Sequence, residues 1–259
     1  MFRWIVLIFE MDQLKLIPGR LLAASLLALA IALPAAATVI YHAVTVSNPG
    51  TIVGTVKFEG TPPPPEKIAV TKDVGVCGKQ VHYDQSLMVG KDGAIANAVV
   101  ALPDIEKGKP FPPVAQNYKF DQIGCEYVPH VLAIPAGAAI DVINSDGILH
   151  NIHDFPTNNR QINMAQPGFK KMIRVHIAKP DIIRVECDAH NWMRGWWYVA
   201  ANPYYAVTGA DGHFALTNVP PGTYTIRVWQ EKLGTQERKV TVTPGATVTV
   251  DFTMAAKAG

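Results

Sequence analysis

Beyond about residue 45, apolar and polar positions alternate in short runs and show almost no helical period. The runs are bounded by Gly, Pro, Asn or Asp, and they include TIVGTVKFEG, HVLAIPAGAAIDVIN, KKMIRVHI, DIIRVECD and GWWYVAA. Many short strands separated by turn residues are typical of a β-sandwich or a β-barrel. We therefore expect an all-β protein with no long helix after residue 45.

The N-terminus has the pattern of a targeting segment. An apolar run, LLAASLLALAIAL, occupies residues 21–33; it follows Lys15 and Arg20 and precedes the small residues PAAAT. This pattern predicts a signal peptide over residues 1–37, cleaved after Ala37. An uncleaved membrane anchor is the alternative, because the apolar run can be extended through Pro34 to Val44. In both cases the remainder is expected to be exported to the periplasm or another extracytoplasmic space.

Charge excludes one class of partner. The formal net charge is only +2, and neither a basic patch nor an RNA-type aromatic motif is present in the sequence. Nucleic acid is therefore not an expected partner.

The last part of the chain has a pattern of its own. Residues 203–259 alternate cleanly between apolar and polar positions around the turns GADG, NVPPG and TPGA, which predicts a separate small β-sandwich. This stretch resembles the carboxypeptidase regulatory-like (transthyretin-like) family. The resemblance rests on Asp211-Gly212, Phe214, Leu216, Val219-Pro220-Pro221-Gly222, Tyr224 and the strand to Trp229. It implies a folding and contact module and no chemistry.

The chain has three cysteines, an odd number for an oxidising compartment. Cys77 and Cys125 lie in glycine-containing, loop-like sequence, GVCGK and QIGCEY. We predict a Cys77–Cys125 disulfide and an unpaired Cys187.

Cys187 belongs to a motif with metal-ligand spacing. The string VECDAHNWMRGWW places Cys187, His190 and Met193 in a Cys-x2-His-x2-Met loop between two predicted strands. Thiolate and thioether are soft ligands, and with imidazole they favour copper over magnesium or calcium. A trigonal site also needs a second imidazole, for which NSDGILHNIH offers His150 and His153. Their odd separation puts the two rings on opposite faces of an extended chain, so only one of them can bind the same ion.

Together these features resemble the cupredoxins, the blue copper proteins, with a ligand loop closest to that of amicyanin. The resemblance covers about residues 128–199, and it implies that AIANAVVAL (94–102) is the first strand. It implies a Greek-key β-sandwich and a mononuclear type 1 copper. The ligands would be His150, Cys187, His190 and Met193. Asn151 would tie the two ligand loops together. Residues 45–125 have no counterpart in small cupredoxins and form an N-terminal extension.

Several neighbouring residues have expected roles. Trp192 beside Met193 should shield the copper or widen an apolar docking face. By the resemblance, the His190 ring edge would reach the surface as the electron port. Of the tandem tryptophans, one should pack in the core and the other against the neighbouring domain. The other histidines are expected outside the site, with His153 near it, His130 structural, and His42, His82, His176 and His213 on the surface.

The expected organisation is thus a leader (1–37), a cupredoxin-like domain with an N-terminal β extension (38–202) and a carboxypeptidase regulatory-like sandwich (203–259). The expected function is one-electron transfer without enzymatic activity, with a c-type cytochrome or a membrane redox complex as partner. The membrane is a partner only if the leader is uncleaved. Two alternatives stay open: a copper storage or delivery protein, and a structural or assembly module of an extracytoplasmic redox complex.

Overall fold

The computed structural model describes residues 41–113 and 117–256, so the predicted leader lies outside the described residues. Its regular structure is almost entirely β-strand, which confirms the expected all-β class. The helical segments of the described residues are a four-residue helix, α1 (Val74–Cys77), and a 3-10 turn, η1 (Lys91–Gly93). Within 41–113 and 117–256, no helix is long and apolar enough to cross a membrane.

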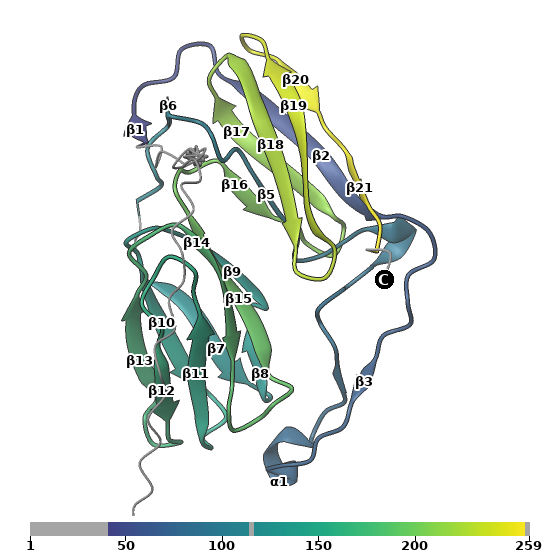
Figure 1. Cartoon of the computed structure of the whole chain (residues 1–259), viewed down its shortest axis with the longest axis vertical. Coiled ribbons are helices and arrows are strands. Elements are labelled where there is room, and N and C mark those ends of the chain that lie inside the picture. Colours follow the sequence, from purple (N-terminus) through teal and green to yellow (C-terminus); the bar gives the residue numbers. More distant parts are fainter. Residues whose placement is uncertain (1–40, 114–116, 257–259) are drawn as a thin grey trace, which may run out of the picture. The chain divides into compact units, whose positions relative to one another are not determined.

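Two sheets built from residues 118–200 form the first sandwich (Figure 1). One has the order β13-β10-β7-β8, with β7 (Tyr118–Ile123), β8 (Glu126–Val128), β10 (Ala139–Asn144) and β13 (Met172–His176). The other has the order β12-β11-β14-β15-β9, with β9 (Val131–Pro135), β11 (His150–Phe155), β12 (Asn163–Gln166), β14 (Asp181–Glu186) and β15 (Arg194–Ala200). Strands β7 and β10 run parallel, as do β9 and β15.

The alternating sequence pattern explains this first core. Every second residue of β10 and of β14 is buried, because successive side chains of a strand point to opposite faces. Trp197 is fully buried in this core, whereas Trp196 stacks edge-on against Trp229 at a centroid distance of 5.0 Å. The two tryptophans thus divide as predicted between the core and the neighbouring domain.

The second sandwich also has two sheets, with the orders β16-β5-β18-β19 and β17-β2-β20, and β21 pairs with the end of β2. Its strands are β2 (Gly50–Phe58), β5 (Val99–Ala101), β16 (Tyr205–Val207), β17 (His213–Val219), β18 (Gly222–Gln230), β19 (Gly234–Val242), β20 (Thr247–Thr249) and β21 (Phe252–Met254).

Strands β2 and β5 correct the expected division at residue 202. AIANAVVAL was expected to begin the first sandwich, but its strand β5 lies between β16 and β18 of the second. Strand β2 likewise pairs with β17, β20 and β21. Without these two strands, β17 and β18 would expose unpaired backbone and apolar side chains. The second sandwich is therefore completed by chain that precedes the first.

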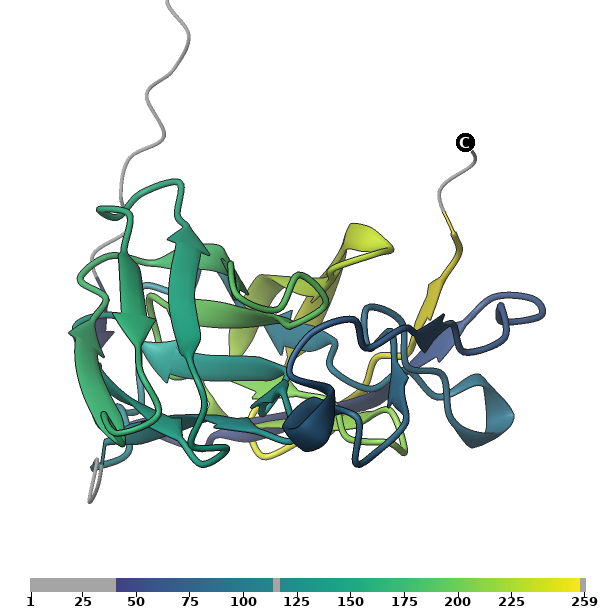
Figure 2. The ribbon, with the colours of Figure 1, turned by 90° about the horizontal axis from the view of Figure 1, so that it is seen from below.

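Residues 59–93 connect β2 to the segment before β5, and we call them the arm. The arm contains β3 (Lys67–Ile68), α1, β4 (His82–Tyr83) and η1, and β3 pairs with β4. It is the blue segment carrying α1 in Figure 2. The predicted Cys77–Cys125 disulfide is confirmed, and it joins the arm to the turn between β7 and β8. A second short pair, β1 (His42–Ala43) with β6 (Lys107–Gly108), is parallel.

Candidate metal centre

The predicted ligands come from two neighbouring strands of the first sandwich. His150 is the first residue of β11, and Cys187 follows the last residue of β14. These strands are antiparallel neighbours, so the two residues meet at the same end of the sheet. His190 and Met193 lie on the loop from β14 to β15. The amide of Met193 donates to the His190 carbonyl (2.9 Å), and the amide of Cys187 donates to the Met193 carbonyl (3.2 Å). These bonds close the loop on itself.

Three donor atoms converge inside the protein. Nδ1 of His150 lies 3.1 Å from Nδ1 of His190, and Cys187 Sγ lies 3.9 Å from the first and 3.8 Å from the second. A point equidistant from the corners of a triangle with these sides is about 2.1 Å from each, which matches the roughly 2.0–2.3 Å bonds of imidazole nitrogen and thiolate sulfur to a metal ion such as zinc. Both rings are completely buried, and Cys187 is 2% exposed.

The other ring nitrogens fix how the histidines are oriented. Nε2 of His150 donates to Asp146 Oδ2 (2.9 Å), and Nε2 of His190 donates to Asp73 Oδ2 (2.9 Å). With a proton on each Nε2, the neutral rings direct their two Nδ1 lone pairs at one another. Two lone pairs at this distance repel, unless a proton or a metal cation lies between them. The arrangement therefore fits a cation-binding site.

The surroundings shift the pKa values of the two histidines differently. Burial lowers the pKa of His150, but the hydrogen bond to Asp146 and the nearby Cys187 outweigh it and raise that pKa to about 9. Burial lowers the pKa of His190, and the neighbouring His150 adds to this, although the hydrogen bond to Asp73 opposes both. The pKa values of the two neighbouring rings are therefore shifted in opposite directions.

Met193 is the thioether ligand that the sequence predicts. It is 2% exposed and packs in the same core cluster as Cys187. Two imidazoles, one thiol and a thioether suit copper better than the hard cations, which prefer oxygen ligands. The structure thus brings together the donor atoms of His150, Cys187 and His190, and Met193 as a further ligand stays a prediction.

Asn151 and His153 are two residues apart and lie on the same face of β11, opposite to that of His150. Asn151 Oδ1 accepts from the Asp188 amide, and its Nδ2 donates to Asp188 Oδ2 (3.0 Å), so it ties β11 to the loop after Cys187. His153 points away from the centre, where its Nδ1 donates to Asp188 Oδ1 (2.9 Å).

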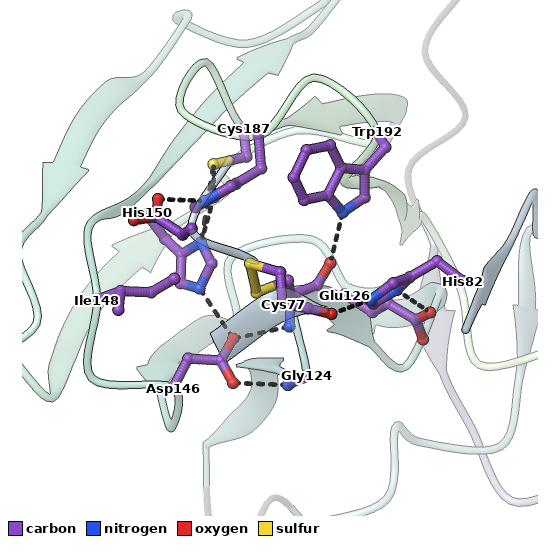
Figure 3. Close-up of a disulfide and its surroundings, with 12 residues drawn as sticks. Cys77, His82, Gly124, Glu126, Asp146, Ile148, His150, Cys187 and Trp192 are labelled. Carbon is purple, nitrogen blue, oxygen red and sulfur yellow. Dashed lines mark hydrogen bonds and ion pairs between the residues drawn. A yellow bond between two sulfur atoms is a disulfide. The ribbon is translucent and has the colours of Figure 1, made fainter. Parts of the chain in front are cut away.

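Trp192 and the disulfide pack behind the histidines. The Trp192 ring centroid is 5.1 Å from that of His190, and its Nε1 donates to the Cys125 carbonyl (3.2 Å). The indole therefore covers the site, in keeping with the first of its two expected roles. Cys77 forms the disulfide with Cys125, and Figure 3 shows Cys77 between His150 and His82.

Two expectations about histidines are wrong. The His190 ring edge does not reach the surface, because the residue is completely buried and Asp73 of the arm covers its Nε2. His82 is 1% exposed and not on the surface; its Nε2 bonds to the Cys77 carbonyl (2.8 Å) and its Nδ1 to Glu126 (2.9 Å). Both differences have the same origin, since the arm packs against this end of the first sandwich.

The sequence reasoning missed Asp73 and Asp146, the carboxylates that position the two rings. Asp146 had a local signal, because it lies four residues before His150 in the same strand-end motif. Asp73 had none, since TKDVGVC has no feature that distinguishes it from an ordinary polar loop.

One family model matches the C-terminal part of the chain. Residues 199–255 match the family model of the carboxypeptidase regulatory-like domain. A 63-residue stretch is 35% identical to the probable rhamnogalacturonate lyase A of Aspergillus terreus, and it spans 24% of this chain and 12% of that protein.

Solved structures similar to about a third of the chain include copper proteins. The copper-containing nitrite reductase of Thermus scotoductus is 21% identical over 35% of this chain and 23% of its own, with a TM-score of 0.31. A purple cupredoxin of Nitrosopumilus maritimus is 20% identical over 32% of this chain and 100% of its own (TM-score 0.27). The amicyanin of Paracoccus versutus is 18% identical over 34% of this chain and 84% of its own, with a TM-score of 0.28.

Proposed function

We propose that this chain is an exported type 1 copper protein that carries single electrons between redox partners. The observation that supports this most directly is the buried triangle of His150 Nδ1, His190 Nδ1 and Cys187 Sγ, with Met193 in the same buried core cluster as Cys187. Copper held by these residues would supply reversible one-electron oxidation and reduction.

The surroundings of the four donors favour a carrier over an enzyme. All four donor residues are buried, and a His2Cys set with a weak thioether leaves no open position for a substrate. Asp146 and Asp73 hold the two rings through Nε2, so the donors need little rearrangement when the charge of the site changes. These features support electron transfer without catalysis of a substrate reaction.

Location and partner follow from the same proposal. The buried Cys77–Cys125 disulfide supports an oxidising, extracytoplasmic compartment, since such bonds are rare in the cytosol. The partner would then be a redox protein of that compartment, either a c-type cytochrome or a membrane redox complex.

Copper titration of metal-free protein tests the proposal. Addition of Cu(II) should saturate at one ion per chain and produce an intense thiolate-to-copper absorption band toward the red end of the visible spectrum. Reduction should bleach the band and reoxidation should restore it over many cycles. Binding of several ions per chain, or rapid loss of copper to a chelator, would favour storage or delivery. Direct binding of azide or nitrite to the copper would favour catalysis.

A further inference from the structure

The arm reaches the candidate metal centre through Asp73, which immediately precedes α1. Its Oδ2 accepts the hydrogen bond of His190 Nε2 at 2.9 Å, and its side chain is 40% exposed whereas that of His190 is 0% exposed. Among the described residues, Asp73 is the hydrogen-bond partner of this nitrogen. A solvent-facing carboxylate of the arm therefore covers the Nε2 edge of the buried ligand.

The arm is fastened close to Asp73. The disulfide begins at Cys77, four residues later, and ends at Cys125 of the first sandwich. Gln80 Nε2 donates to the Gly124 carbonyl (3.1 Å), and His82 bridges the Cys77 carbonyl and Glu126. These contacts hold α1 against the turn at residues 124–126.

That same turn also positions the other histidine. The amides of Gly124 and Cys125 donate to the two oxygens of Asp146, at 2.6 and 2.8 Å, and Asp146 accepts from His150 Nε2 (Figure 3). The sulfur of Cys125, an oxygen of Asp146 and a ring nitrogen of His150 lie within 4.8 Å of one another. The disulfide thus joins the turn that orients His150 to the segment that orients His190.

We propose that the arm is a lid on the metal centre, with Asp73 as the positioning residue of His190 and the Cys77–Cys125 disulfide as the latch. The closed lid keeps the Nε2 edge of His190 away from water and from metal chelators. Metal enters and leaves past His190 when Asp73 moves aside, and the disulfide restrains that movement. This inference rests on the proposed copper site, but its effect on His190 can be measured without metal.

The chain provides matched variants for a test. Asp73→Ala removes the carboxylate that covers His190, whereas Asp73→Asn keeps an amide oxygen that can accept from Nε2. Asp92→Ala is the control, because Asp92 is an aspartate of the same arm with a similar left-handed backbone (φ 55° against 47° for Asp73). It lies in η1, and none of the described hydrogen bonds or ion pairs joins it to the metal centre.

The first measurement uses metal-free protein and the imidazole reagent diethyl pyrocarbonate, with the modified residues quantified by mass spectrometry. Asp73→Ala should raise the modification rate of His190 by about tenfold or more, the order expected for loss of one charge-assisted hydrogen bond. His150 should stay protected, because Asp146 belongs to its own loop. In Asp92→Ala, His190 should be modified at the same rate as in the natural sequence. In Asp73→Asn, its modification rate should lie between the rates of Asp92→Ala and Asp73→Ala. The exposed His42, His176 and His213 should react equally in all variants.

The second measurement follows copper loss from loaded protein to a chelator. Asp73→Ala and the double variant Cys77→Ala/Cys125→Ala should each accelerate loss by about 10- to 100-fold, the usual range for removal of an outer-shell partner. Asp92→Ala should leave the rate unchanged.

The two proposals fail in different ways. If the natural sequence binds no copper, the proposed function fails, while the labelling of metal-free protein still tests the lid. If His190 stays as protected in Asp73→Ala as in the natural sequence, the lid is wrong even where copper binds. Equal exposure of His150 and His190 in that variant would also overturn it, because the whole site would then have opened.

Discussion

Nδ1 of His150 lies 3.1 Å from Nδ1 of His190, yet the two rings are held by carboxylates of different origin. Asp146, the partner of His150, is four residues away in sequence, whereas Asp73, the partner of His190, is 117 residues away. One ligand is thus positioned by its own loop and the other by the arm. This difference separates the parts of the site that local sequence can predict from those that it cannot.

His150→Gly should remove one donor while leaving the other three in place. The protein should then bind copper weakly and without its colour, and added imidazole should restore the absorption band by filling the space. His153→Gly is the matched control on the same strand, and it should change the reduction potential slightly at most, since His153 contacts Asp188 and not the centre. Absorption spectra of both variants decide the ligand. Bleaching by His153→Gly together with an intact His150→Gly site would contradict the assignment.

Met193→Leu should keep the fold and the colour and raise the reduction potential. Leucine conserves the buried volume, but it removes the sulfur that stabilises Cu(II) as a weak ligand. Met164→Leu provides the control, because Met164 packs on the same core from β12. Cyclic voltammetry measures both. An unchanged potential in Met193→Leu would exclude the thioether as a ligand.

Loss of the disulfide should lower the free energy of unfolding. Its ends are separated by 48 residues, and a loop of that size corresponds to about 4 kcal/mol in the chain-entropy model. Urea unfolding of Cys77→Ala/Cys125→Ala should show this loss. A thiol reductant should lower the free energy of unfolding of the natural sequence toward that of the variant, and it should leave the variant unchanged. Equal stability of the two proteins without reductant would contradict the prediction.

Asp154 should make stability depend on pH. Burial raises the pKa of its carboxyl, which is fully buried in β11 and has one oxygen without a hydrogen-bond partner among the described residues. The folded-state pKa is above the unfolded value, so stability falls as pH rises through the folded-state pKa. Asp154→Asn should therefore gain stability relative to the natural sequence as pH rises above the ordinary Asp pKa of about 3.9.

Asp141→Asn should change stability with the opposite pH dependence. The hydrogen bond from Arg174 lowers the pKa of Asp141, so its contribution is present at neutral pH and is lost as pH falls through that lowered pKa. Urea unfolding at several pH values measures both variants. A pH-independent difference between Asp154→Asn and the natural sequence would show that desolvation of the carboxylate is not the cause.

Local pattern was sufficient for the ligand loop. The Cys-x2-His-x2-Met spacing closes through two hydrogen bonds within residues 187–193, and the odd separation of His150 and His153 puts their rings on opposite faces. These relations depend on backbone geometry over a few residues, so they can be predicted without knowledge of the fold. The choice of His150 over His153 came from the resemblance to the cupredoxins.

Long-range pairing was not predictable in the same way. The apolar run at β5 indicates a buried strand, but it does not show which of the two sandwiches includes that strand. The contact of Asp73 with His190 likewise depends on the path of the whole arm. Alternation thus predicts which residues face a core, whereas the choice of partner strand depends on the complete set of sheet edges.

The most direct test of the copper assignment compares the natural sequence with Cys187→Ser after loading with one equivalent of Cu(II). Serine keeps nearly the same shape, but its hydroxyl is far less acidic than a thiol and cannot provide the thiolate-to-copper band. The natural sequence should show the intense band toward the red end of the spectrum, and Cys187→Ser should be essentially colourless with weakened copper binding. An intense band that persists in Cys187→Ser, or its absence from copper-loaded natural protein, would contradict a type 1 copper centre in this chain.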